Sequence, residues 1–165
     1  MARVLVLMGS NVDKESNLPR ALALLAAHAH IELVATSPTY ATVAIGQDGG
    51  AVSQPGFHNA AALLETTLSP EELRQELRAM EAQLGRVRTA DRFAPRTIDL
   101  DIALYDDVVV RVDGRQIIPD PDILRFAHVA IPLAAVAPDW VHPQTGGTLA
   151  AIAQTFDEVE TEQVR

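Results

Sequence analysis

The chain has 165 residues, of which 48% are hydrophobic and 21% are charged, and it contains no cysteine. This composition is typical of one folded domain and excludes a disordered chain, cysteine-ligated metal sites and thiol catalysis. The net charge of −9 disfavours a broad nucleic-acid-binding surface, so any phosphate site must be local. No apolar stretch approaches the ~20 residues of a membrane-spanning helix and no signal peptide is evident, so we expect a cytoplasmic protein without a membrane partner.

The first elements predicted are a buried strand and a helix. Residues 3–8 form a short apolar run that ends at Gly9-Ser10-Asn11, which is typical of a central strand buried on both faces. The helix that follows is expected to be capped by Ser16 or Asn17, with Pro19 in its first turn.

Two further extended segments flank a glycine-rich stretch. Residues 31–42 are predicted to be extended with a break at Ser37-Pro38, and residues 57–66 are predicted to form a strand. The segment 46–56 between them contains four glycines and a proline. We interpret a loop of this length as functional.

A second helix is marked at both ends. Ser69 is predicted as its N-cap, with Pro70 at the first position. Glu72 completes an S-x-x-E capping box, and Gly85 ends the helix.

The second half of the chain predicts a strand, a hairpin and short helices. The Asp113-Gly114 pair is a hairpin signal. The predicted elements are a basic loop at 86–96, strands at 97–105, 108–112 and 115–118, short helices around 121–136 and 147–156, and a mobile acidic tail at 157–165. Because several strands are joined by tight turns, we predict an α+β fold with a mixed, largely antiparallel sheet flanked by helices. Residues 1–156 are predicted to form a single domain.

The strand at 97–105 carries two aspartates. In a pleat of period two, Asp99 and Asp101 point to one face, about 7 Å apart along the strand. The other face is predicted to hold Ile98, Leu100, Ile102 and Leu104. A divalent cation would relieve the repulsion between the two carboxylates. The alternative is a solvated strand face.

Four arginines lie just before this strand: Arg86, Arg88, Arg92 and Arg96. In an acidic chain, such a cluster beside carboxylates suggests a polyphosphate held between guanidinium groups and Mg²⁺. The alternative is a surface ion network with the nearby acidic residues Glu81, Asp91, Asp99 and Asp101. The five histidines lack a zinc-site spacing, and neither a P-loop nor a G-x-G-x-x-G motif occurs.

The motifs occur in a specific order. They are Gly9-Ser10-Asn11, Phe57-His58-Asn59-Ala60-Ala61, Glu81 with Gly85-Arg86-Val87-Arg88, and Arg92-Phe93-Ala94-Pro95-Arg96-Thr97-Ile98-Asp99-Leu100-Asp101. This order resembles the 6-hydroxymethyl-7,8-dihydropterin pyrophosphokinase family, which transfers pyrophosphate from ATP to a pterin alcohol in folate biosynthesis. The resemblance spans roughly residues 2–143 and implies a sheet of ferredoxin-like character.

The resemblance implies roles for individual residues. Asp99 and Asp101 would hold two Mg²⁺ ions on the ATP phosphates, and Arg86 and Arg96 would be catalytic residues that face the phosphates. ATP contacts would fall at Glu81, Arg88, Arg96, Ile102 and Arg115. Pterin contacts would fall at Thr42, Val43, Ile45, Phe57, Asn59 and His128.

The chain also departs from the family pattern. The family's Thr-Pro-Pro is Thr42-Val43-Ala44 here, so the wall of the pterin pocket loses rigidity. Asp120, Phe126 and His128 stand where the family has histidine, arginine and phenylalanine. An aspartate near ATP would repel phosphate unless it is turned away, and a histidine still stacks, with less area.

These departures leave alternatives to an active pterin pyrophosphokinase. One is a pyrophosphokinase for a different heterocyclic alcohol, and the other is a catalytically weak paralogue that acts as a binding protein. The favoured interpretation takes ATP and a pterin alcohol as partners, assigns no general base and favours a monomer.

Overall fold

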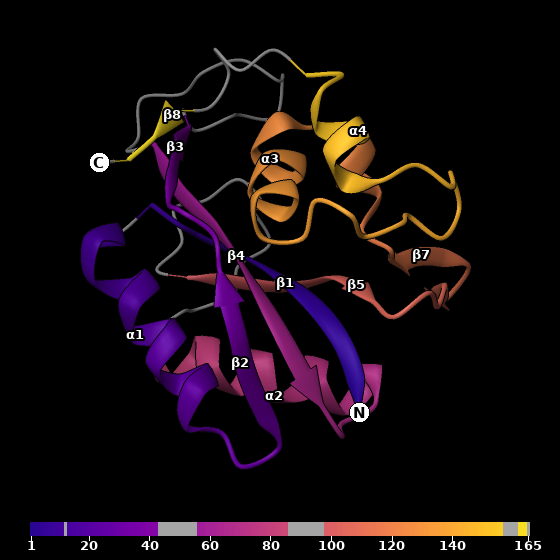
Figure 1. The fold of residues 1–165 in the computed structure, drawn as a ribbon. Coiled ribbons are helices and arrows are strands. Elements are labelled where there is room, and N and C mark those ends of the chain that lie inside the picture. Colours follow the sequence, from indigo (N-terminus) through magenta and orange to yellow (C-terminus); the bar gives the residue numbers. More distant parts are fainter. Residues whose placement is uncertain (12, 43–55, 86–97, 157–161, 165) are drawn as a thin grey trace.

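The computed structural model describes residues 1–11, 13–42, 56–85, 98–156 and 162–164. Its centre is a six-stranded sheet with helices on both faces (Figure 1). The strands are β1 (Ala2–Ser10), β2 (Ile31–Thr36), β3 (Tyr40–Thr42), β4 (Phe57–Thr66), β5 (Asp99–Tyr105) and β8 (Glu162–Gln163). They lie in the order β5-β1-β4-β3-β8, and β2 also pairs with β4. The described strand pairs are all antiparallel, which confirms the predicted α+β class.

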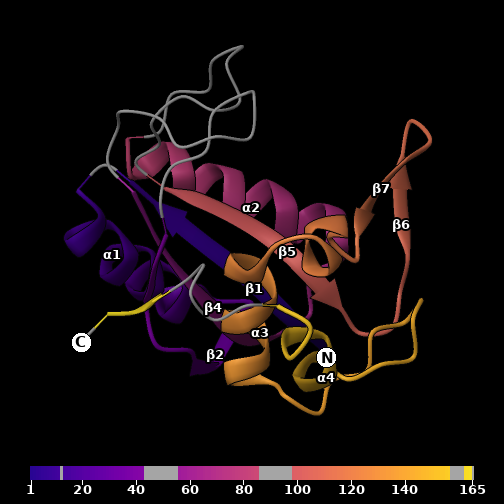
Figure 2. The same cartoon turned by 90° about the horizontal axis from the view of Figure 1, so that it is seen from above.

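The helices divide between the two faces of this sheet (Figure 2). They are α1 (Lys14–Ala27), α2 (Pro70–Gln83), η1 (Pro121–Leu124), α3 (Ala127–Val136) and α4 (Leu149–Ala153). Apolar side chains of α1 and α2 form one core against the sheet, and those of α3 and α4 form a second core on its opposite face. A separate two-stranded hairpin consists of β6 (Val110–Val112) and β7 (Arg115–Ile118). No helix in the described part of the chain is long and apolar enough to cross a membrane.

Strand β1 is the central strand that its apolar run predicts. It pairs with β4 on one side and with β5 on the other. Val4 and Val6 enter the core under α1 and α2, whereas Leu5 enters the core under α3 and α4, and all three are fully buried. Burial of both faces therefore accounts for the absence of alternating polar residues in this strand.

Helix α2 begins and ends where its sequence signals predict. The hydroxyl of Ser69 accepts a hydrogen bond from the Glu72 N–H at 3.2 Å, and the Ser69 N–H donates to the Glu72 carboxylate at 3.1 Å. This reciprocal pair satisfies two donors that the first helical turn would otherwise leave open. Gly85 follows the helix with φ of 91°, a backbone conformation that glycine adopts without steric cost.

Helix α1 begins earlier than predicted. Its N-cap is Asp13, so the prediction of Ser16 or Asn17 as the cap was wrong. The N–H groups of Ser16 and Asn17 already donate to the Asp13 carbonyl, at 3.0 and 2.9 Å. Both residues therefore belong to the first turn, and Asp13 leads into it with a left-handed backbone, φ 47°, rather than with a side-chain cap.

A β-bulge in β5 corrects one side-chain assignment. Leu5 pairs with Leu104 but Val6 pairs with Ile102, so Ala103 is an extra residue on β5. The bulge turns Leu104 into the core under α3 and α4, whereas Ile98, Leu100 and Ile102 lie in the core under α1 and α2. Leu104 therefore does not share a face with the other three, as a uniform pleat had predicted.

The remaining predictions for the second half concern the hairpin, the short helices and the tail. Asp113 and Gly114 both have positive φ, 52° and 77°, which matches the twist of a two-residue hairpin turn. The short helices predicted around 121–136 and 147–156 are η1, α3 and α4. In the C-terminal tail, Glu162 and Gln163 form the short strand β8, which pairs with β3, and the mobility of the tail stays a prediction.

Candidate active site

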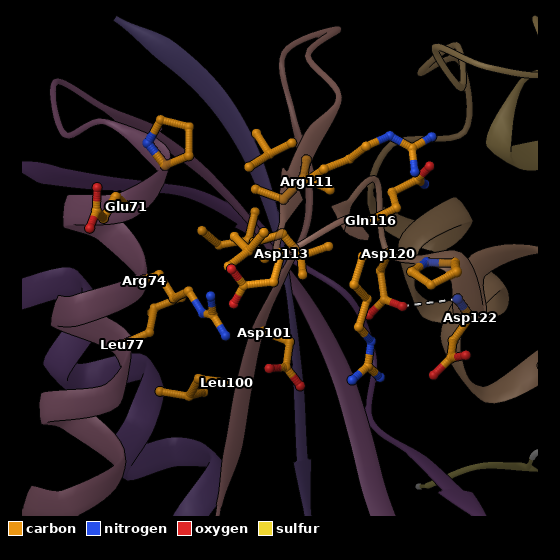
Figure 3. A pocket seen from close by; sticks show the side chains of 18 of the residues that line it. Glu71, Arg74, Leu77, Leu100, Asp101, Arg111, Asp113, Gln116, Asp120 and Asp122 are labelled. Atoms are coloured by element: carbon orange, nitrogen blue, oxygen red, sulfur yellow. Dashed lines mark hydrogen bonds between the residues drawn. The ribbon is translucent and has the colours of Figure 1, made fainter.

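A cavity of about 980 Å³ opens between α2, β5, the β6–β7 hairpin and η1 (Figure 3). This volume lies in the range of small-molecule and cofactor sites. Its basic lining residues are Arg74, Arg78, Arg111, Arg115 and Arg125, and its acidic ones are Glu71, Asp101, Asp113, Asp120 and Asp122. Apolar side chains, including those of Leu77, Ile102 and Val110, complete the wall. A cavity with an apolar wall and many charges suits a ligand that combines a flat base with phosphates.

The sheet places three predicted motif residues in one row. Asn59 of β4 pairs with Gly9 of β1, and Gly9 pairs with Asp99 of β5. Residues paired directly across antiparallel strands point to the same face, so Asn59 and Asp99 lie about 10 Å apart, two strand spacings, on one surface. A Cβ atom at Gly9 would lie 3.1 Å from Oδ1 of Asn59. Glycine therefore leaves room beside the Asn59 amide, on the side toward Asp99.

The structure brings Asp99 and Asp101 to the same face of β5. Their neighbours Leu100 and Ile102 enter the core under α1 and α2, so both aspartates project from the opposite face. The Asp101 side chain is 37% exposed and lines the cavity. Figure 3 shows Asp101 and Asp120 in the cavity, with Arg74 on the α2 side.

An arginine that the sequence analysis did not single out holds Asp101. Nη2 of Arg78 donates to Oδ1 of Asp101 at 3.0 Å. Nη1 of the same guanidinium donates to the Leu100 carbonyl at 2.7 Å and to Oε2 of Glu81 at 2.9 Å. Arg78 thereby joins α2 to the segment of β5 that carries both aspartates. The signal that could have found it is its position three residues before Glu81, on the same helix face.

Glu81 lies behind this face rather than in the cavity lining. Its side chain is 2% exposed, and Oε2 accepts hydrogen bonds from the Leu100 N–H at 2.8 Å and from Arg78. A buried carboxylate needs such partners, because an uncompensated one is strongly destabilising. The contacts shown for Glu81 fix β5 against α2, and its predicted contact with ATP stays a prediction.

The carboxylates of the cavity do not have ordinary proton affinities. Burial, together with the charge of Asp99, raises the pKa of Asp101 above its usual range, although Arg78 opposes this rise. Burial raises the pKa of Asp120 to about 6, against the hydrogen bond that its Oδ1 accepts from the Asp122 N–H at 2.9 Å. Clustered carboxylates with raised pKa values are a recognised mark of functional sites.

The pterin-site predictions that fall on described residues cluster at the β3–β4 pair. Nδ2 of Asn59 donates to Oγ1 of Thr42 at 3.0 Å, which fixes the plane of the Asn59 amide. Phe57 pairs with Thr42, and its ring lies 3.9 Å from the position of a Cβ atom at Gly9. Thr42, Phe57 and Asn59 therefore lie together at one end of the sheet, beside Gly9.

Two predicted ATP contacts lie in the cavity wall. Ile102 and Arg115 both line it, on β5 and on β7. Several predicted residues lie outside the described part of the chain: Val43, Ala44, Ile45, Arg86, Arg88, Arg92, Arg96 and the segment 46–55. Their assigned roles stay predictions.

His128 lies in the first turn of α3. Its ring stacks on Phe126, with centroids 5.2 Å apart and ring planes inclined by 26°. Burial lowers the pKa of His128, so the neutral imidazole is favoured near neutral pH. A neutral ring suits stacking, and the predicted contact of His128 with a pterin stays a prediction.

The fold and the cavity define a class. Two aspartates project from one face of β5, and one of them, Asp101, lines a cavity large enough for a nucleotide; metal-dependent phosphoryl-transfer enzymes use such carboxylates to hold Mg²⁺. A family model described as 7,8-dihydro-6-hydroxymethylpterin-pyrophosphokinase matches residues 5–138. The chain belongs to this family, and it is therefore an enzyme of the pyrophosphokinase class, a transferase.

Two relatives support this assignment over most of the chain. A 2-amino-4-hydroxy-6-hydroxymethyldihydropteridine pyrophosphokinase of Synechocystis sp. is 37% identical over 151 residues, which are 91% of this chain and 74% of that protein. A protein of the same name from Methylorubrum extorquens is 39% identical over 142 residues, 86% of each chain.

A solved structure supports the fold. Wild-type HPPK-DHPS of Plasmodium falciparum, with pterin and p-hydroxybenzoate, aligns with a TM-score of 0.72 at 11% identity. The alignment covers 98% of this chain and 45% of that longer chain. At this identity the likeness shows the fold alone.

Proposed function

We propose that this chain transfers pyrophosphate from ATP to the hydroxymethyl group of 6-hydroxymethyl-7,8-dihydropterin and releases AMP. The observation that carries the proposal is the row Asn59–Gly9–Asp99, which joins an amide suited to a pterin edge with a carboxylate suited to a metal-bound phosphate. Family membership and the names of the two relatives agree with this chemistry.

The donor set around the cavity fits magnesium. Asp99 and Asp101 offer hard carboxylate oxygens from one strand face, and Mg²⁺ binds through one or two carboxylates together with substrate phosphates and water. The described residues contain no group of three or more His, Asp or Glu side chains that could hold a metal ion. This finding agrees with a Mg²⁺ site in which Asp99 and Asp101 supply some ligands and the phosphates of the nucleotide supply the others. We propose that the two aspartates hold two Mg²⁺ ions with ATP, which neutralise the charge that develops on the phosphates.

The reaction proposed is a direct displacement at phosphorus. The hydroxymethyl oxygen of the pterin attacks the β-phosphorus of ATP, the bond from that phosphorus to the oxygen of the α-phosphate breaks, and AMP leaves. The attacking hydroxyl loses its proton to water, which balances the step. Phosphoryl transfer asks the protein mainly to align the reactants and to stabilise charge.

The chain's own residues supply that alignment. The Asn59 amide, held by Thr42, presents fixed hydrogen-bonding groups for the pterin edge, and Phe57 offers a stacking face. Ile102 and neighbouring apolar side chains offer a surface for the base of ATP, and Arg115 offers a cation. Arg86, Arg88 and Arg96 remain proposed phosphate-binding residues on sequence grounds.

The test measures AMP formed from ATP and Mg²⁺ with and without the hydroxymethyl dihydropterin. We expect AMP only when the pterin is present, and a loss of at least about a hundredfold in kcat for Asp99→Asn. Circular dichroism checks that the variant remains folded. AMP that forms with another heterocyclic alcohol but not with this pterin would contradict the proposed substrate. Nucleotide binding without any AMP would contradict the proposed reaction.

A further inference from the structure

Arg78 places a full positive charge against a carboxylate proposed to bind metal. Its Nη2 lies 3.0 Å from Oδ1 of Asp101, and its side chain is 29% exposed. The same guanidinium is anchored by Glu81 and by the Leu100 carbonyl, so it does not depend on Asp101 for its position. The geometry is therefore that of a fixed cation to which Asp101 is tied.

The surroundings of Asp101 explain what a fixed cation can do there. Asp99 projects from the same strand face, and the charges of Asp99 and Asp120 both act on Asp101. Like charges held together in a partly buried site repel one another, so without a cation the carboxylates would push apart or bind an ion from solution. Within the described part of the chain, Arg78 is the basic partner of Asp101.

We propose that Arg78 is a positioning residue for Asp101, which compensates its charge in the free enzyme and engages Oδ1, so that a metal ion approaches from the cavity through Oδ2. This rests on the proposed function only in taking Asp101 as a metal ligand. Because the guanidinium competes with a cation for the same carboxylate, it weakens binding of the metal alone. Metal then binds well only with the phosphates of the nucleotide, which supply further ligands.

The charge of Arg78 and the shape of its guanidinium group contribute separately to the compensation and the orientation of Asp101. Lysine keeps the positive charge but lacks the planar fork that engages Asp101, Glu81 and Leu100 together, whereas glutamine loses the charge. Arg74 is a matched control, because it lies one turn earlier on α2 and lines the same cavity. No hydrogen bond or ion pair joins Arg74 to Asp101 in the described structure.

The first experiment measures binding of Mn²⁺ in the absence of nucleotide. Mn²⁺ is a paramagnetic substitute for Mg²⁺, and its binding is followed by the loss of the electron paramagnetic resonance signal of the free ion. Arg78→Gln is expected to bind Mn²⁺ about tenfold more tightly than the wild type, because a positive charge 3.0 Å from the Asp101 carboxylate is removed. Arg78→Lys is expected within about threefold of the wild type, and Arg74→Gln likewise. The proposal is overturned if Arg78→Gln and the wild type bind Mn²⁺ with equal affinity, or if neither protein binds Mn²⁺.

A double-mutant cycle ties the effect to Asp101. In an Asp101→Asn background, Arg78→Gln is expected to leave Mn²⁺ affinity unchanged within about twofold, because the carboxylate it compensated is gone. If Arg78→Gln raises Mn²⁺ affinity as much in the Asp101→Asn background as in the wild type, Arg78 does not act through Asp101 and the proposal is overturned. Circular dichroism and urea unfolding accompany each variant. If Arg78→Gln does not fold, Arg78→Lys carries the test through its kinetics.

The second readout separates orientation from charge. Arg78→Lys keeps the charge but does not hold the orientation of Asp101. Although its Mn²⁺ affinity is expected near that of the wild type, its kcat is expected to fall about tenfold, and its KM for the pterin is expected within about threefold of the wild-type value. Wild-type kcat in Arg78→Lys overturns the positioning role. The two proposals fail separately. A wild type that forms no AMP contradicts the proposed function but does not affect the Mn²⁺ double-mutant cycle. If the effects of Arg78→Gln and Asp101→Asn on Mn²⁺ affinity are additive, only the proposed role of Arg78 is contradicted.

Discussion

Gly9 connects the two halves of the proposed site. It lies between Asn59 and Asp99 in the row across β4, β1 and β5, and it contributes no side chain to the face they share. A side chain here would meet Oδ1 of Asn59, whose amide is already held by Thr42. The need at this position is therefore for space, since Gly9 does not have a positive φ.

Gly9→Ala is expected to raise KM for the pterin about tenfold, because the added methyl group crowds the Asn59 amide at 3.1 Å. KM for ATP should change less, since the cavity between α2 and the hairpin is not lined by Gly9. Steady-state kinetics with each substrate varied in turn measures both constants. Gly147→Ala is the control, because a Cβ atom there would meet only ordinary contacts, the nearest at 3.7 Å. An unchanged pterin KM in Gly9→Ala would show that the row does not border the pterin.

The position of Asp120 shows whether its carboxylate is turned away from the proposed ATP site. Its Oδ1 accepts the Asp122 N–H and so caps η1, and in the cavity it adds negative charge. The carboxylate is therefore not simply turned away from the site. Burial is the main cause of its raised pKa of about 6, and the charges of Asp122 and Asp99 add to it.

Asp120→Asn should stabilise the fold at neutral pH and not in acid. A carboxyl whose pKa is raised on folding holds its proton more tightly when folded, so its stabilising contribution is complete below the unfolded pKa. That contribution is lost as pH rises from about 4 through about 6. Asparagine keeps the capping oxygen without the charge, so urea unfolding should show a gain of about 2 kcal/mol near pH 8. The gain should vanish near pH 4.

The control for this prediction is Asp113→Asn, in the exposed hairpin turn of the same cavity wall. Asparagine tolerates the positive φ of that turn, so this variant should differ little from the wild type at either pH. A gain for Asp120→Asn of equal size at both pH values would mean that charge burial is not its cause.

At the scale of elements, α2 carries the residues that fix β5. Arg78 and Glu81 both bond to Leu100, so the start and register of the helix set the position of the paired aspartates. Its capping box lies at the far end, between Ser69 and Glu72. Glu71 of the first turn lines the cavity, but the residues that fix β5 lie about two turns or more further along the helix.

Ser69→Ala is expected to lower the free energy of unfolding by about 1 kcal/mol, because the Glu72 N–H loses its side-chain acceptor. The value of kcat well below the unfolding temperature should stay unchanged, since the cap is remote from Arg78. Urea unfolding and AMP formation measure the two effects. Glu72→Gln retains an oxygen that can accept the Ser69 N–H, so it should lose less stability. A large fall in kcat for Ser69→Ala would show that the helix end and the site are coupled.

Elements with local signals could be predicted, and features set by distant partners could not. The Ser69 cap and the Asp113-Gly114 turn follow from backbone chemistry within a few residues. The bulge at Ala103 depends on how β5 meets β1, and β8 forms only because the chain end reaches β3. Neither leaves a mark in the periodicity of its own segment, so the assignment of Leu104 was wrong and the strand β8 was not predicted.

The same distinction applies to the site across the whole molecule. The common face of Asp99 and Asp101 follows from the pleat of a single strand. The row Asn59–Gly9–Asp99 requires the strand order β4-β1-β5, which local sequence patterns do not contain. Arg78 was missed for a related reason: its partner Asp101 lies 23 residues further along the chain, on another element.

Because the cavity is built from α2, β5, the hairpin and η1, a ligand bound there contacts segments far apart in the sequence. A ligand that binds only the folded state stabilises the molecule by about 2.7 kcal/mol at a hundred times its Kd. For a chain of this size, that is a rise of about 5–10 °C in Tm. We expect this rise with Mg²⁺ and α,β-methylene-ATP, in which the bond to be broken is replaced, and a much smaller one when EDTA removes the metal. Asp99→Asn should also lose most of the rise, while a variant remote from the cavity, Gly147→Ala, should keep it. A full rise in EDTA, measured by calorimetry, would mean that the nucleotide binds without the metal and that the paired aspartates serve another purpose.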